Sequence, residues 1–108
     1  MFIATTIKIK PSNKQFHMKL FKEAAMLFTL DELDSFECDT LPDQSIKVFF
    51  RTNVIEPVDF VTDLRQIEKA VFETAQHLKA IDTGCGVDAE CYGSRGSGET
   101  KLFNLQLS

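Results

Sequence analysis

The sequence from residue 60 to residue 92 reads FVTDLRQIEKAVFETAQHLKAIDTGCGVDAECY, and its hydrophobic period changes near Gly84. Before Gly84, large residues recur every three or four positions, which is the spacing of a helix with one apolar stripe. That series consists of Phe60, Leu64, Ile67, Val71, Thr74, Leu78 and Ile81. After Gly84, apolar Val87, Ala89 and Cys91 alternate with polar residues, as in a strand. The stretch therefore predicts a helix over 60–81, ended by Gly84, and a strand directly after it.

The N-terminal part of the chain predicts the same two kinds of element in the opposite order. Apolar and polar positions alternate as far as Pro11, with Ile3, Thr5, Ile7 and Ile9 on one side of the expected strand. Ser12 followed by Gln15 has the form of a capping box, in which a hydroxyl and an amide cap a helix start. The apolar spacing that follows predicts a helix over about 13–28.

Two hairpins complete the pattern. Residues 36–39 and 46–51 alternate in polarity around the turn residues 42–45. Residues 87–92 and 102–107 alternate in the same way around 93–98, which are rich in Gly and Ser and predict a flexible loop. Four of the expected strands therefore form two antiparallel pairs.

The resulting order is strand, helix, strand, strand, helix, strand, strand. We expect an α+β two-layer sandwich, with the two helices on one face of a mainly antiparallel sheet. The first six elements match the βαββαβ order of ferredoxin-like folds, and the last is an added C-terminal strand. Right-handed crossovers place the first and third strands side by side at the sheet centre. Residues 1–108 make one α+β domain in this interpretation.

The charges are separated along the chain. Twelve Lys and Arg against 16 Asp and Glu give a net charge of −4. Residues 1–22 hold five lysines and no acid, whereas residues 23–43 hold seven acids and no base. An acidic chain is a poor candidate for binding nucleic-acid phosphates, which takes clustered Lys and Arg. No apolar run approaches the ~18 residues of a membrane span. We therefore expect no direct contact with nucleic acid or membrane.

The densest charge is an acidic run that lacks the pattern of a calcium loop, because it has no glycine at the sixth position. We interpret the run as an acidic face that docks on a protein partner with a basic patch, one that otherwise holds nucleic acid. Plain solvation of the surface is the alternative. The proposed acidic face consists of Asp31, Glu32, Asp34, Glu37, Asp39 and Asp43.

A second candidate surface is the side of the sheet that the helices leave open. If Ile46, Val48 and Phe50 point inward, then Phe49 points outward, and the same parity turns Tyr92 and Leu102 outward. Asp88 and Glu90 share this outward face, and the sequence lacks the basic aromatic motif of RNA-binding sheets. Both observations argue against stacking of RNA bases on the face. An aromatic strip of this kind indicates protein binding or self-association as a homodimer, with Phe49 and Tyr92 as anchors. Burial of the strip by the loops at the sheet edge is the alternative.

The glycine-rich loop holds the ingredients of an anion site in Ser94, Arg95 and Ser97. A phosphate loop opens onto a helix N-terminus, however, and here a strand follows. A plain hairpin loop is therefore the competing interpretation.

Three cysteines, Cys38, Cys85 and Cys91, are too few for a disulfide framework and indicate a reducing, cytoplasmic location. Their spacing, with His77, does not fit a zinc site, so we expect no metal. Cys85 lies between two glycines, and we expect it to be exposed and the fastest of the three to react. It follows a helix C-terminus, whose partial negative charge raises a thiol pKa, so we assign it no catalytic role.

No convergent set of catalytic residues is present, and we expect no cofactor. The sequence favours a small acidic binding or regulatory protein that docks on another protein. Inhibitors encoded by phages and mobile elements, which act on basic or nucleic-acid-binding surfaces, are examples of this class. The alternative is a small oligomeric enzyme with its active site at a subunit interface.

Overall fold

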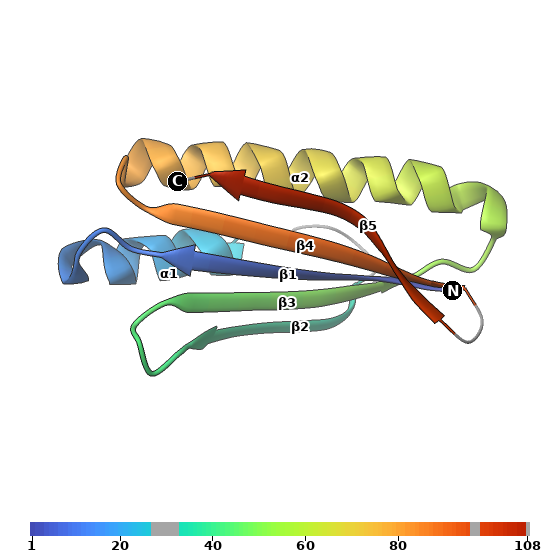
Figure 1. Ribbon diagram of the computed structural model, residues 1–108, viewed down its shortest axis with the longest axis horizontal. Coiled ribbons are helices and arrows are strands. Elements are labelled where there is room, and N and C mark those ends of the chain that lie inside the picture. The colour runs from blue at the N-terminus through green and yellow to red at the C-terminus, as the bar shows by residue number, and fades with distance from the viewer. Residues whose placement is uncertain (27–32, 96–97, 108) are drawn as a thin grey trace.

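The computed structural model of the chain describes residues 1–26, 33–95 and 98–107 (Figure 1). Its elements are β1 (Phe2–Lys10), the short 3-10 helix η1 (Lys14–Phe16), α1 (His17–Met26), β2 (Leu33–Thr40), β3 (Ile46–Asn53), the short 3-10 helix η2 (Pro57–Asp59), α2 (Phe60–Ile81), β4 (Gly86–Arg95) and β5 (Gly98–Leu107). The predicted order of strands and helices is confirmed, and α2 covers the predicted residues. The end of the helix predicted over 13–28 lies outside the described residues.

The five strands form one antiparallel sheet in the order β2-β3-β1-β4-β5. The first and third strands are neighbours at its centre, as predicted, and β4 flanks β1 on the other side. Both helices pack on the same face of the sheet (Figure 1). The chain is therefore a two-layer α+β sandwich with the ferredoxin-like βαββαβ order, and β5 is the added strand beside β4.

The core lies between this sheet face and the helices. Alternate residues of β1 point into it, and Ile3, Thr5, Ile7 and Ile9 are all at most 2% exposed. Along α2 the buried stripe consists of Phe60, Ile67, Val71, Ala75 and Leu78. The periodicity of the sequence therefore predicted which faces are buried. Among the described residues, no helix combines the length and the apolar character that crossing a membrane requires.

A buried carboxylate joins the end of α2 to the segment between β1 and η1. Asp82, the C-cap of α2, is 2% exposed and accepts hydrogen bonds from the Ser12 backbone N–H at 2.8 Å and the Ser12 hydroxyl at 2.6 Å. The Gly84 N–H also donates to it, at 3.2 Å. The predicted capping box of Ser12 is therefore wrong, because this residue is bound to Asp82. Asn13 caps η1 instead, and its Oδ1 accepts from the Gln15 N–H at 2.8 Å.

A bulge in the last hairpin changes the parity of β5. Cys91 is paired with Phe103 but Tyr92 with Lys101, so Leu102 is the extra residue. A Cβ built on Gly93 would lie 2.9 Å from Leu102 Cδ1 and 3.1 Å from Phe60 Cζ. Leu102 therefore fills the space above Gly93 on the helical side. The prediction that Leu102 points outward with Phe49 is wrong, because strict alternation does not continue through a bulge.

Candidate functional site

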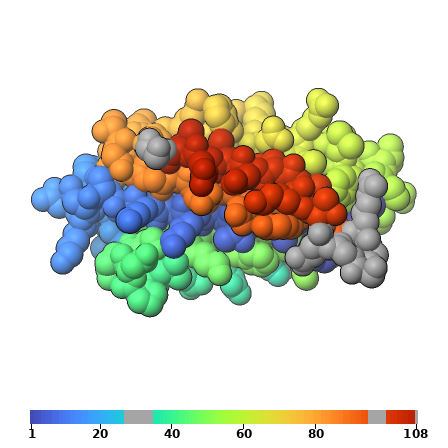
Figure 2. Space-filling view, viewed as in Figure 1, coloured from blue at the N-terminus to red at the C-terminus, as the bar shows by residue number. Residues whose placement is uncertain are grey.

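The face of the sheet opposite the helices is the candidate docking surface, and we call it the open face. Figure 2 shows the molecule in the orientation of Figure 1, with the strands across the surface. Its side chains alternate with those of the core and come from all five strands. They include Phe2, Ala4, Thr6, Lys8, Lys10, Glu37, Asp39, Lys47, Phe49, Arg51, Asp88, Glu90 and Tyr92.

Phe49 and Tyr92 stand on opposite sides of the central strand. Phe49 of β3 is in register with Thr6 of β1, and Tyr92 of β4 is in register with Ala4. Both aromatic residues are half-buried. The side chains of β1 beside them, Thr6 and Ala4, are smaller than the two rings. Large aromatic side chains at the centre of a surface are typical anchors of protein interfaces.

Tyr92 is held in position by two neighbours. Its hydroxyl donates a hydrogen bond to Glu90 Oε2 at 3.1 Å, and the Lys101 Nζ lies 3.8 Å from Glu90 Oε1. The same ammonium group lies 6.0 Å from the centre of the Tyr92 ring. A side chain that is already ordered loses less conformational entropy when a partner binds it. Tyr92 therefore has the order expected of an anchor.

Two of the predicted acidic residues lie on the open face. Glu37 is in register with Phe49, and Asp39 with Lys47, across the β2–β3 pair. The acidic face and the aromatic face predicted from the sequence thus meet at the β2 edge of one surface. Asp31 and Glu32 lie outside the described residues, and the backbone of Asp34 belongs to β2.

Asp43 belongs to a different environment. It lies in the β2–β3 turn, where its Oδ1 accepts from the Ser45 N–H at 3.0 Å and from the Ser45 hydroxyl. The hydroxyl and amide of Ser45 lower the pKa of Asp43 below its ordinary value. The residue also lines a hollow of about 410 Å³ with Lys10, Lys14 and His17. The carboxylate of Asp43 therefore stabilises its own turn.

Both signs of charge are present on the open face. One row across four strands consists of Asp39, Lys47, Lys8 and Asp88. Lys8 and Asp88, with Lys10, also line a hollow of about 390 Å³ at one end of this face. The acidic side chains near β2 are therefore part of a mixed surface with an acidic edge.

The predicted anion loop is shorter than expected. β4 continues to Arg95 and β5 begins at Gly98, so the backbone of Ser94 and Arg95 is paired with Glu99 and Gly98. Ser97 lies outside the described residues. Anion binding at this loop stays a prediction.

The cysteines differ from the expectation in their exposure. Cys85 is fully buried, as is Cys91, whereas Cys38 of β2 is partly exposed. The prediction that Cys85 is the exposed thiol is wrong, because its side chain points into the core despite the flanking glycines. Burial raises the pKa of Cys85, with the charge of Asp82 adding to the effect, and burial raises the pKa of Cys91 to about 11. The Nε2 atom of His77 lies 3.0 Å from Glu23 Oε2, at hydrogen-bond distance. The described residues contain no group of three or more His, Cys, Asp or Glu side chains that is suited to holding a metal ion.

We expect Cys38 to be the first thiol modified in the native protein. Burial and the charge of Asp39 raise its pKa, so its reaction will be slower than that of a free thiol at neutral pH. Cys85 and Cys91 should react only when the chain opens or unfolds. Thiol titration with and without denaturant measures this order. Replacement Cys38→Ser should remove the early phase, and an early phase that persists in this variant would contradict the assignment.

The comparisons with known proteins identify the fold. No known protein family matches the sequence, and no curated protein matches it. The de novo designed protein Foldit4 is similar in structure, with a TM-score of 0.60 and 14% identity over 88% of this chain and 100% of its own. A mutant of SnoaB, a cofactor-independent oxygenase from Streptomyces nogalater, has a TM-score of 0.52 and 13% identity over 89% of this chain and 95% of its own. Rv0793 from Mycobacterium tuberculosis has a TM-score of 0.51 and 12% identity over 90% of this chain and 100% of its own. At such identities the similarity shows a shared fold and no shared activity.

Proposed function

We propose that this chain is a small binding or regulatory protein that docks on another protein through its open face. The observation that carries the proposal is the cross-strand register of Glu37 with Phe49 and of Asp39 with Lys47. It places acidic side chains beside an aromatic anchor on a face that no described helix covers. Interfaces commonly combine an apolar centre with a polar rim in this way.

The proposed partner is a protein with a basic patch, of the kind that otherwise holds nucleic acid. Its basic groups would meet Glu37 and Asp39 at the β2 edge, and Phe49 and Tyr92 would contact its surface next to them. Rim charges mainly set the rate of association and its salt dependence, and buried aromatic anchors set the lifetime of the complex. The three free cysteines support a reducing location such as the cytoplasm for this activity.

The test compares variants of the open face with matched variants elsewhere. Glu37→Lys with Asp39→Lys should abolish capture of the basic partner at low salt, since it reverses the charge at the acidic edge. Glu56→Lys with Glu73→Lys changes the net charge equally at exposed positions off this face, and it should leave capture intact. Wild-type capture should fall at about 0.5 M salt, where the screening length is below roughly 5 Å.

The aromatic anchors give an independent measurement. Phe49→Ala should shorten the lifetime of the captured complex in a surface-binding assay. The control is Val58→Ala, which changes an 80% exposed side chain in η2 and should leave the lifetime unchanged. A Glu37→Lys, Asp39→Lys variant that keeps every wild-type partner, with the same lifetimes, would reject the open face as the docking surface.

A second candidate is a small enzyme with its active site at a subunit interface. The hollow of about 390 Å³ on the open face favours it, because Lys8 and Asp88 place opposite charges in a space that a second subunit could close. SnoaB, which shares the fold, is described as a cofactor-independent oxygenase. This candidate needs an oligomer that buries the open face, so Phe49→Lys should dissociate it. An oligomer unaffected by Phe49→Lys would exclude this arrangement.

A further inference from the structure

Strand β5 forms a free edge of the sheet with unusual composition. It pairs with β4 on one side and with no described strand on the other. Residues 102–107 read LFNLQL, without a charge, a proline or a glycine. An edge of this kind is a template for pairing with another strand, and proteins usually block it with charges, prolines or bulges.

The opposite edge of the sheet carries such protection. β2 presents Glu37 and Asp39, and its register with β3 shifts between Leu33 and Ser35. β5 has its bulge at Leu102, which leaves residues 103–107 regularly paired with β4. The two edges of one sheet therefore differ, and β5 is the edge suited to pairing.

A groove runs along the same edge on the helical side. The two helices leave β5 incompletely covered, so Phe103 and Leu105 are only partly buried, while Val87, Ala89 and Cys91 of β4 are at most 2% exposed. Phe72 of α2 is 44% exposed beside them. The groove has a volume of about 510 Å³ and is lined by Arg65, Glu68, Lys69, Phe72, Phe103, Asn104 and Leu105.

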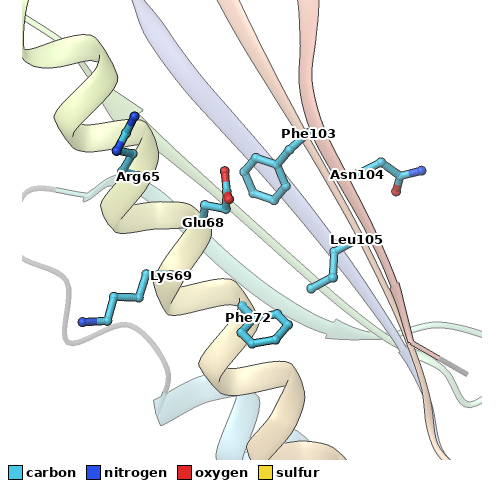
Figure 3. A pocket seen from close by; sticks show the side chains of 7 residues that line it. All are labelled: Arg65, Glu68, Lys69, Phe72, Phe103, Asn104 and Leu105. Carbon is cyan, nitrogen blue, oxygen red and sulfur yellow. The ribbon is translucent and has the colours of Figure 1, made fainter.

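Figure 3 shows how these side chains are directed. Phe103 and Leu105 point toward α2, and Phe72 points from α2 toward Leu105. Asn104 points away from the helix, on the open-face side of β5. The edge thus has an apolar side at the groove and a polar side at Asn104.

We propose that β5 pairs with the β5 strand of a second copy of this chain, antiparallel and with its two-fold axis at Asn104. In this register Phe103 lies opposite the partner's Leu105, and Leu105 opposite the partner's Phe103. Residues directly opposite each other point to the same face, so both apolar pairs line the grooves of the two copies. Asn104 lies opposite the partner's Asn104 on the other face, where the two amides can bond to each other.

The charges around this axis are compatible with a second copy. Phe103, Asn104 and Leu105, the residues that pair regularly across the axis before the bulge at Leu102, carry no charge, so no like charges meet there. The groove rim carries Arg65 and Lys69 together with Glu68, which gives each copy both signs of charge to present to the other. Pairing at the edge leaves the open faces free, side by side in one continuous sheet. The inference is therefore independent of the proposed docking function.

The test uses the residue on the two-fold axis. Asn104 is exposed, so Asn104→Lys should preserve the fold while placing two like charges directly opposite each other. We expect sedimentation equilibrium to show a dimer for the wild type and a dissociation constant about fivefold higher for Asn104→Lys. Asn53→Lys makes the same change at an exposed position on the interior strand β3, and it should leave the dimer unchanged.

A charge swap at residue 104 distinguishes pairing of the two copies at this residue from a general loss of dimer stability. Asn104→Asp alone should weaken the dimer as Asn104→Lys does, but a mixture of the two variants should form heterodimers more tightly than either forms homodimers. A wild type that stays monomeric, including one whose β5 edge instead takes a strand from another protein, would overturn the proposal. So would a dimer that both variants leave unchanged. Capture of a basic partner is measured separately and can fail or succeed in either case.

Discussion

Ile67→Ala should lower the free energy of unfolding by about 2–5 kcal/mol, a large share of the stability of a domain this size. Ile67 is 3% exposed and lies in the middle of α2, on the stripe that packs against the sheet. Alanine removes three carbon atoms and leaves a cavity, because a packed core closes only partly around the gap. Urea unfolding followed by circular dichroism measures the loss.

The same substitution at a second isoleucine is the control. Ile55 is 90% exposed in the connection between β3 and η2, so Ile55→Ala should change the free energy of unfolding by less than about 0.5 kcal/mol. Equal losses at the two positions would mean that α2 packs on the sheet with another face.

Asp82→Asn should lower the free energy of unfolding by about 1.5–3 kcal/mol at neutral pH. Burial opposes the charge of Asp82, but the hydrogen bonds from Ser12 and Gly84, together with nearby Lys79, outweigh it and lower the pKa of the carboxyl. An asparagine has one acceptor oxygen where the carboxylate has two. Its NH₂ group is itself a donor and would face the donor groups of Ser12 and Gly84. Ser12 would lose at least one of its two bonds to this side chain.

The loss at Asp82 should depend on pH. An aspartate with a lowered pKa stabilises the folded state above its unfolded pKa of about 3.9, and this contribution disappears as the pH falls through the folded pKa. The difference between wild type and Asp82→Asn should therefore be full at neutral pH and shrink below about pH 4. Asp59→Asn, at the exposed N-cap of α2 where no side-chain capping bond is made, should show little difference at any pH. A difference at Asp82 that stays constant down to low pH would contradict the ionic role.

Regular periodicity is what made most of the fold predictable. The three- and four-residue steps of α2 and the alternation of β1 each specify one buried face, and the structure buries those faces. Ser12 and Asn13 are both good capping residues and lie next to each other. The choice between them is made by Asp82, 70 positions away in the chain, and no local pattern carries that information.

The surface was harder to predict, because strand pairing redistributes residues that are neighbours in sequence. The acidic run is divided between strand β2 and the turn that follows it. Glu37 and Asp39 lie on the open face, whereas Asp43 lies in the turn and accepts a hydrogen bond from Ser45. The groove beside β5 depends on a helical layer that leaves a fifth strand partly uncovered. Its sequence signal is Phe72, a large apolar residue one position outside the stripe of α2.

The central position of β1 has a consequence for how the chain folds during synthesis. β1 comes first in chain order, yet it pairs with residues 46–53 and 86–94, which the ribosome makes later. Until β4 has been made, β1 lacks a neighbour on one side, and its isoleucines lack a complete core. Such distant pairings slow folding and expose strand edges to aggregation. The native sheet can therefore form only after β4 has emerged from the ribosome, however early β1 becomes available.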